Sequence, residues 1–424
     1  MRWEIHNRLQ SELVRNSARL LSANVLAQVV GLLVYPILTR MYAPEDFGLL
    51  NLFMSIGGIL LVLSTCGYHD AIVLPKEERK SQALVQLCVG IILCLSILLV
   101  FSIPFSPLIS SLFKAPELQN WWWLMPVYIC GMGMWNVLSN YYIRQKAFAR
   151  ISGYQIFQSL LNAGNKLGLG ALGCFSGGLI ISSVVAPVIS LGTSIAKGRR
   201  LLAGLWHVNK NEVCQAAKEY YRFPLYSLPR SLVNILSNNL FVLLLAPVFG
   251  LTEIGYYGMA LTLAFRPLQL IVQSVYQVFL QRVAQRVNEK RKIRHLFVGY
   301  ITRAGVIFIP LFAGLWFVLP ILTEWLLGNE WRMSGEYIRL MLPWLLLMVL
   351  TGPFTFITDI FHLQRPALWV EIGYLCVRLA TLVSGIWLHD FRLTLLLYSI
   401  SSALVCLGQL IWFYFIINRY ERTA

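Results

Sequence analysis

The sequence predicts an all-α protein that crosses a membrane about twelve times and is built from two similar halves. Hydrophobic residues make up 57% of the 424 positions, and charged residues only 13%, about half the charged fraction of a typical soluble domain. Apolar runs of about 20 residues, each long enough to cross a bilayer as a helix, recur along the whole chain. They are continuous rather than alternating, which excludes a transmembrane β-barrel.

The spans follow from these apolar runs and from the polar, glycine- or proline-containing turns between them. The twelve predicted spans are residues 20–40, 47–67, 83–103, 122–142, 154–174, 178–196, 225–248, 254–278, 298–320, 337–361, 369–388 and 393–417.

A short repeat predicts the two halves. YAPEDFG at 42–48 joins the first two spans, and FGLTEIG at 249–255 joins the seventh and eighth. In both copies an aromatic residue is followed, after three positions, by an acid, an apolar residue and a glycine. In the first copy Pro44 opens a helix, and Gly48 allows another helix to approach closely. A repeat of half a chain length is typical of transporters with two related lobes. We therefore expect an N-terminal lobe over 1–196 and a C-terminal lobe over 225–424.

Positive charge gathers in alternate connections. Of the 35 lysines and arginines, the connections after odd-numbered spans hold only Arg40, Lys114, Arg332 and Arg392. The positive-inside rule then places both termini and the longer basic connections in the cytoplasm. The linker over 197–224 is one of these connections, and its pattern predicts an amphipathic helix at the membrane surface, where Lys197, Arg199 and Arg200 meet anionic lipid headgroups. No basic domain lies outside the spans, so nucleic acid is not an expected partner.

Six cations fall inside the predicted spans, where an isolated charge is costly and usually faces water or a partner. Four are deep and are candidates for binding an anionic substrate in a cationic cavity: Lys166, Arg230, Arg266 and Arg378. Two others lie nearer span ends, and three amides add hydrogen-bonding capacity for a sugar; these secondary candidates are Arg303, Arg339, Asn162, Asn234 and Asn238. The alternatives are snorkelling for the first two and helix–helix hydrogen bonding for the amides.

Only two acids accompany these cations in the predicted spans. Asp359 and Glu371 lie near cytoplasmic ends and are candidates for ion coupling. Glu371 and Arg378 share a helix face, so a structural ion pair is the alternative to a transport role. Even with both acids paired, four cations stay unmatched. A cationic interior favours an anionic passenger such as a pyrophosphate group.

Other chemistries find no support in the sequence. The histidines and the eight cysteines show no metal-ligand spacing, and no GxxxxGK[ST] stretch is present. We therefore expect no metal, no cofactor, no catalytic residues and no ATP hydrolysis. The cysteines are interpreted as small apolar packing residues.

The sequence resembles the bacterial polysaccharide exporters, the O-antigen and capsule repeat-unit flippases of the multidrug/oligosaccharidyl-lipid/polysaccharide superfamily. The resemblance rests on LVRNSARLLSANVLAQ at 13–28, LTRMYAPEDFGLL at 38–50, AIVLPKEE at 71–78, FGLTEIGYYGMALTLAFRPLQLI at 249–271 and the span count. It implies a V-shaped fold of two six-helix lobes around a cationic cavity, in the bacterial inner membrane. It also implies translocation of undecaprenyl-pyrophosphate-linked oligosaccharide repeat units from the cytoplasmic to the periplasmic leaflet by alternating access.

The partners implied are the lipid-linked oligosaccharide, membrane lipids, and the polysaccharide polymerase and chain-length machinery. Two other functions remain open from the residues. A drug exporter of the multidrug and toxin extrusion type is expected to carry acids in its spans to meet cationic substrates. A membrane polysaccharide polymerase or ligase is expected to carry a large periplasmic loop, and every connection on that side is short in this sequence.

Overall fold

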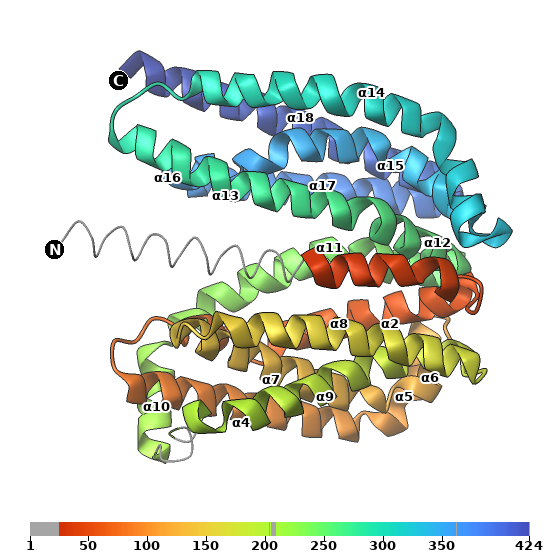
Figure 1. Ribbon diagram of the computed structural model, residues 1–424, viewed down its shortest axis with the longest axis vertical. Helices are drawn as coiled ribbons and strands as arrows, with labels where there is room; N and C mark the ends of the chain where they lie inside the picture. The colour runs from red at the N-terminus through yellow and green to blue at the C-terminus, as the bar shows by residue number, and fades with distance from the viewer. Residues whose placement is uncertain (1–24, 203, 205–208, 362, 424) are drawn as a thin grey trace. The chain divides into compact units, whose positions relative to one another are not determined.

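The computed structural model describes residues 25–202, 204, 209–361 and 363–423, and these residues form helices and turns without a β-strand (Figure 1). The N-terminal segment predicted to lie in the cytoplasm, with Arg2, Arg8, Arg15 and Arg19, and most of the 13–28 motif lie outside the described residues. Contacts divide the chain into two compact units, one ending at Ile254 and the other covering Gly255–Ala424.

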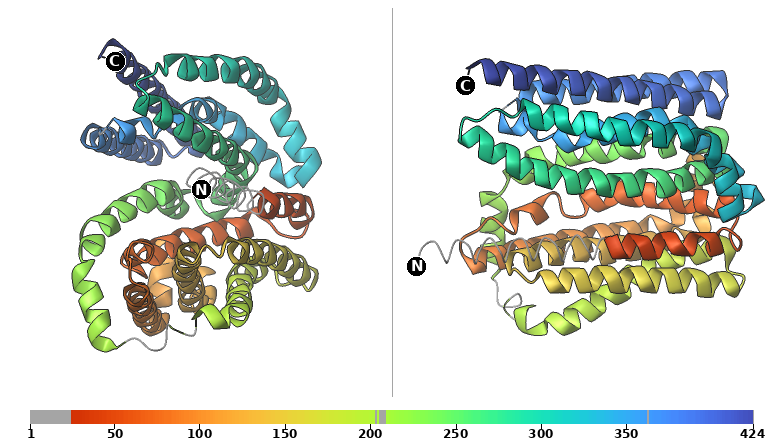
Figure 2. Two further views of the ribbon diagram at one scale, coloured as in Figure 1. Left: turned by 60° about the vertical axis from the view of Figure 1, so that its left-hand side comes forward. Right: turned by 45° about the horizontal axis from the view of Figure 1, so that its top comes forward.

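The described part of the first unit holds seven helices of 14 to 28 residues that run side by side (Figures 1 and 2). They are Val25–Leu38, α2 (Pro44–Leu63), α4 (Glu78–Phe101), α7 (Leu124–Arg144), α8 (Phe148–Ala171), α9 (Phe175–Leu202) and α11 (Leu228–Phe249). Shorter elements connect them: α3 (Tyr68–Ala71), η1 (Ile103–Phe105), α5 (Ser106–Leu112), α6 (Leu118–Trp121), α10 (Lys210–Glu219) and the π-turn η3 (Phe223–Ser227).

The second unit begins inside α12 (Leu251–Ala260) and continues through the π-turn η4 (Leu261–Phe265) into α13 (Arg266–Asn288). Its other long helices are α14 (Arg294–Leu327), α15 (Arg332–Thr351), α17 (Gln364–Leu388) and α18 (Phe391–Thr423). The short elements η5 (Asn329–Trp331), η6 (Gly352–Phe354) and α16 (Ile357–Ile360) lie between them.

The fold is that of an all-α, multi-pass membrane protein, as the sequence predicts. Each of the twelve predicted spans overlaps a helix of the described chain. By length and hydropathy, eight of the described helical segments are fit to cross a membrane on their own. The others are shorter or more polar; α8, for example, carries Lys166 and four glycines.

Packing inside each unit is aromatic. In the first unit, Trp135 of α7 stacks on Tyr154 of α8 with ring centroids 3.3 Å apart. In the second, Phe354 of η6 meets Phe297 of α14 at 4.7 Å and Phe279 of α13 at 5.2 Å. Burial of such large rings, strengthened by edge-to-face geometry, stabilises each unit.

Two prolines explain the two π-turns. Pro229 and Pro267 lack a backbone N–H, and a proline ring clashes with the carbonyl four residues earlier. In the structure the helix widens over that stretch, and the N–H groups of Leu228 and Arg266 bond to carbonyls five residues back. A π-turn therefore ends directly before Arg266, and a second one ends three residues before Arg230.

Candidate functional site

The two copies of the repeat meet within the first unit. The Thr252 hydroxyl, at the start of α12, donates a 2.7 Å hydrogen bond to Glu45 in the first turn of α2. These residues are 207 positions apart, the spacing of the repeat, so they are equivalent positions of its two copies. A contact between equivalent positions is what a two-fold relation between the two turns produces.

Gly48 makes this contact possible. A Cβ atom at Gly48 would overlap the backbone carbonyl of Leu251, so only glycine fits against the second copy. The Asp46 carboxylate accepts a 2.9 Å bond from the Ala43 N–H and caps the helix N-terminus. Sequence reasoning identified Gly48 as a close-approach residue but not which segment approaches it.

Lys166 is the deep cation of α8. It is 9% exposed, and its backbone carbonyl accepts a 2.6 Å hydrogen bond from the hydroxyl of Tyr42, the first residue of the repeat. Asn162, one turn earlier, is partly buried. Its Oδ1 atom is enclosed without a hydrogen-bond partner among the described residues. The structure thus places an unsatisfied amide acceptor and a buried lysine one turn apart on α8.

Arg230, Asn234 and Asn238 form a polar stripe on α11. They are spaced four residues apart, which places them on one face of the helix, and all three are exposed. The Asn238 amide donates a 3.1 Å hydrogen bond to Asn234 Oδ1. The stripe begins three residues after the π-turn at η3, so the structure brings together three of the predicted site residues.

In the second unit, Arg378 is enclosed by tyrosines. It is 6% exposed; its guanidinium carbon lies 3.9 Å from the ring centroid of Tyr374 and 5.3 Å from that of Tyr398. An Nη2 donor bonds the Tyr374 hydroxyl at 2.5 Å. Glu371 is exposed, and the ion pairs formed by described residues do not join it to Arg378. Cation–π and hydrogen-bond contacts therefore hold the Arg378 guanidinium against two tyrosines of its own unit.

Arg339 has an acidic partner that the sequence analysis missed. Glu336, one turn earlier on α15, lies 2.5 Å from its Nη2 atom, and the Trp316 ring centroid lies 5.8 Å from its guanidinium carbon. Glu336 precedes the predicted span by one residue and was therefore not counted among the intramembrane acids. Its spacing of three residues was the available signal.

Arg266 and Arg303 differ from Arg378 and Arg339 in their exposure and in their partners. Both are exposed, and within the described residues no acidic side chain forms an ion pair with either of them or with Arg230. Arg266 follows directly after the π-turn η4, much as Arg230 follows η3. π-Turns inside helices are frequent at functional sites. The acid Asp359 lies exposed on α16. Among described residues, no group of three metal-ligating side chains is assembled.

Residues 37–336 match the family described as polysaccharide biosynthesis protein. Over 310 residues the chain is 21% identical to the succinoglycan biosynthesis transport protein ExoT of Rhizobium meliloti, covering 72% of this chain and 60% of that protein. Over 329 residues it is 23% identical to the lipopolysaccharide biosynthesis protein WzxC of Escherichia coli, covering 73% and 62%. The chain thus spans about three fifths of the length of these curated relatives.

Solved structures share the fold. The lipid II flippase MurJ in an inward closed conformation superposes with a TM-score of 0.70 at 13% identity, over 96% of this chain and 90% of that one. A multidrug-resistance MATE-family transporter of the MOP superfamily, facing inward, superposes with a TM-score of 0.61 at 13% identity, over 96% of both chains. The family match covers well over half of the sequence and confirms the resemblance seen in its motifs: the chain belongs to the polysaccharide biosynthesis protein family.

Proposed function

We propose that this protein is a flippase that moves undecaprenyl-pyrophosphate-linked oligosaccharide repeat units from the cytoplasmic to the periplasmic leaflet of the bacterial inner membrane. The repeat units would be used for the synthesis of O-antigen, capsule or exopolysaccharide. The observation that carries the proposal is family membership together with exposed arginines in the predicted spans that form no ion pair with an acid among the described residues. The names of the relatives, a succinoglycan transport protein and a lipopolysaccharide biosynthesis protein, both refer to bacterial surface polysaccharides.

Arg230 and Arg266 are the residues that we assign to the pyrophosphate. Each is exposed, and each sits beside a proline-induced π-turn. A guanidinium offers several N–H donors in a planar fork that matches phosphate oxygens. Arg303 is a secondary candidate of the same kind, and the amides of Asn234 and Asn238 are assigned to the sugar. Lys166 and Asn162 are candidates whose access to substrate would need α8 to shift.

The organisation proposed for the whole chain follows the sequence analysis. Lobes over 1–196 and 225–424, joined by the linker 197–224, would rock about the substrate, with both termini in the cytoplasm. The hydrogen bond between Glu45 and Thr252 supports the repeat itself, because it joins equivalent positions of its two copies. Asp359 and Glu371 are proposed for ion coupling, because both are exposed acids on the second unit. The polymerase and chain-length proteins are the proposed protein partners.

A reconstituted transport assay tests the function. The purified protein is placed in liposomes with a fluorescent pyrophosphate-linked oligosaccharide, and the fraction reachable by an external glycosidase is followed with time. We expect transport by the unaltered protein. Arg266→Gln and Arg230→Gln should slow it roughly 10- to 150-fold, which corresponds to losing one charge-assisted hydrogen bond of about 1.5–3 kcal/mol.

Arg392→Gln is the matched control, because Arg392 is also an exposed arginine but lies at the start of α18, outside the predicted spans. It should transport at the unaltered rate. Transport of cationic drugs with no movement of the lipid-linked oligosaccharide would instead establish a drug exporter. Unaltered rates in both arginine variants would remove the cationic path from the proposal.

A further inference from the structure

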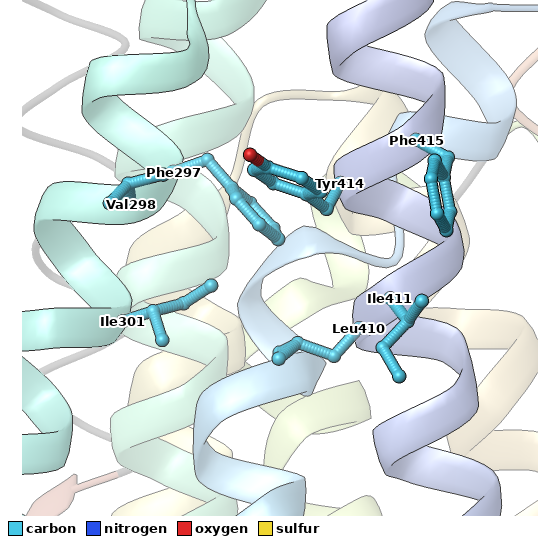
Figure 3. A pocket seen from close by; sticks show the side chains of 7 residues that line it. All are labelled: Phe297, Val298, Ile301, Leu410, Ile411, Tyr414 and Phe415. Carbon is cyan, nitrogen blue, oxygen red and sulfur yellow. The ribbon is translucent and has the colours of Figure 1, made fainter.

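An apolar groove lies between α14 and α18 in the second unit (Figure 3). It encloses about 270 Å³. Its walls are Phe297, Val298 and Ile301 of α14 and Leu410, Ile411 and Phe415 of α18. The outer wall is open, because Ile411 is 48% exposed and Phe415 is 63% exposed. Both helices are fit to cross the membrane, so the groove lies where hydrocarbon chains are available.

One end of the groove carries a positioned cation. Tyr414 lines the groove, its ring centroid 6.5 Å from that of Phe297, and its hydroxyl accepts a 2.7 Å hydrogen bond from Arg294 Nη2. The guanidinium carbon of Arg294 also lies 5.3 Å from the Tyr414 ring centroid. Arg294 itself is exposed. Tyr414 thus holds one donor nitrogen of the guanidinium at the rim, while the Arg294 side chain stays exposed.

The acids near this rim are already engaged. Glu421 Oε1 accepts 2.8 Å bonds from the backbone N–H groups of Ile293 and Arg294, and Glu289 lies 3.1 Å from Arg291. The exposed basic residues near the rim outnumber these two acids. The exposed basic residues of the adjoining chain segments are Lys290, Arg291, Lys292, Arg294, Arg419 and Arg422. The rim therefore carries a net positive charge beside an apolar groove.

We propose that this groove binds an anionic phospholipid of the surrounding leaflet, with one acyl chain between α14 and α18 and the phosphate at Arg294. The apolar walls match the chain, and the positive rim matches the headgroup. Basic clusters at the ends of membrane helices bind anionic lipids, each lysine or arginine contributing about 1 kcal/mol. The occupant is a structural lipid, and the site is separate from the arginines assigned to transport. A lipid here would hold the end of α18 against the start of α14.

Native mass spectrometry of the detergent-purified protein tests the site. Phosphatidylglycerol and phosphatidylcholine with identical acyl chains are titrated separately, with no transport substrate present. We expect phosphatidylglycerol to bind more tightly. Arg294→Gln should weaken its binding about fivefold, the equivalent of about 1 kcal/mol, and bring it toward that of phosphatidylcholine. Ile301→Trp should fill the groove and weaken the binding of both lipids.

The controls carry the same changes elsewhere in the second unit. Arg365→Gln removes an exposed arginine at the start of α17, and Leu404→Trp enlarges an exposed leucine of α18 outside the groove. Both should bind lipid as the unaltered protein does, and thermal unfolding in detergent confirms that each variant is folded. Equal affinity for the two lipids, or unchanged binding in Arg294→Gln and Ile301→Trp, would overturn the proposal. Tighter binding of undecaprenyl phosphate than of phosphatidylglycerol at the same residues would also overturn it, by making the groove a substrate site.

Discussion

Because Arg378 is enclosed by tyrosines, we predict that its substitution by alanine lowers the stability of the protein more than it slows transport. The side chain is 6% exposed and stacks 3.9 Å and 5.3 Å from two tyrosine ring centroids. Each such cation–π contact contributes about 0.5–2 kcal/mol, and removing the Arg378 donor from the partly buried Tyr374 hydroxyl costs about 1–3 kcal/mol. The truncation also leaves a cavity, whereas removing the buried charge returns part of its desolvation cost. We expect a net loss of about 2–4 kcal/mol.

Thermal unfolding in detergent measures this loss. At about 2–4 °C per kcal/mol, the midpoint of Arg378→Ala should fall by roughly 5–15 °C. Arg378→Lys keeps the charge but not the planar fork, so it should also be destabilised, though by less. Transport per folded molecule should change little in both. The reasoning is refuted if Arg378→Ala unfolds at the unaltered temperature while transport is abolished, because the arginine would then act on the substrate.

Three further predictions concern the first unit. Gly48→Ala should destabilise the protein by about 1–3 kcal/mol, because its Cβ meets backbone, whereas Gly90→Ala, with open space on α4, should be neutral or stabilising in the same thermal assay. Burial lowers the pKa of His69 below its ordinary 6.5, although the neighbouring Asp70 acts to raise it. The folded state therefore binds fewer protons than the unfolded state, and the stability of the fold should decrease as the pH drops below about 6.5. In melting curves recorded at several pH values, His69→Gln should reduce this pH dependence. Glu78→Ala should lower the free energy of chemical unfolding by about 1–3 kcal/mol. The substitution removes the carboxylate that lies 3.1 Å from Arg144, whose side chain is only 13% exposed.

Each of these has a contradicting outcome. Equal melting temperatures for Gly48→Ala and Gly90→Ala would show that α2 does not need its close approach. A pH dependence that is unchanged in His69→Gln would assign it to other groups. Unchanged unfolding of Glu78→Ala would mean that the bonds from Arg144 to the backbone of Pro75 and Lys76 suffice.

The sequence predicted some of the site and missed other parts for identifiable reasons. Gly48 was predicted because its repeat places an acid and a glycine at a helix start. Glu336 was missed because span boundaries read from hydropathy are uncertain by several residues, and it falls one residue outside. Tyr398, the second ring on Arg378, lies on another helix, and no pattern within one helix reveals a neighbour across a helix interface.

Hydropathy and charge placement alone determined that this is a helical, multi-pass membrane protein, because every backbone polar group in a bilayer must be bonded within the chain. The motifs determined its family. Which intramembrane cation is exposed and which is enclosed was decided only by the tertiary structure. Helices that are apolar on all sides carry no angular signal, so the rotation that buries Arg378 against tyrosines and leaves Arg266 exposed is set by packing with neighbouring helices.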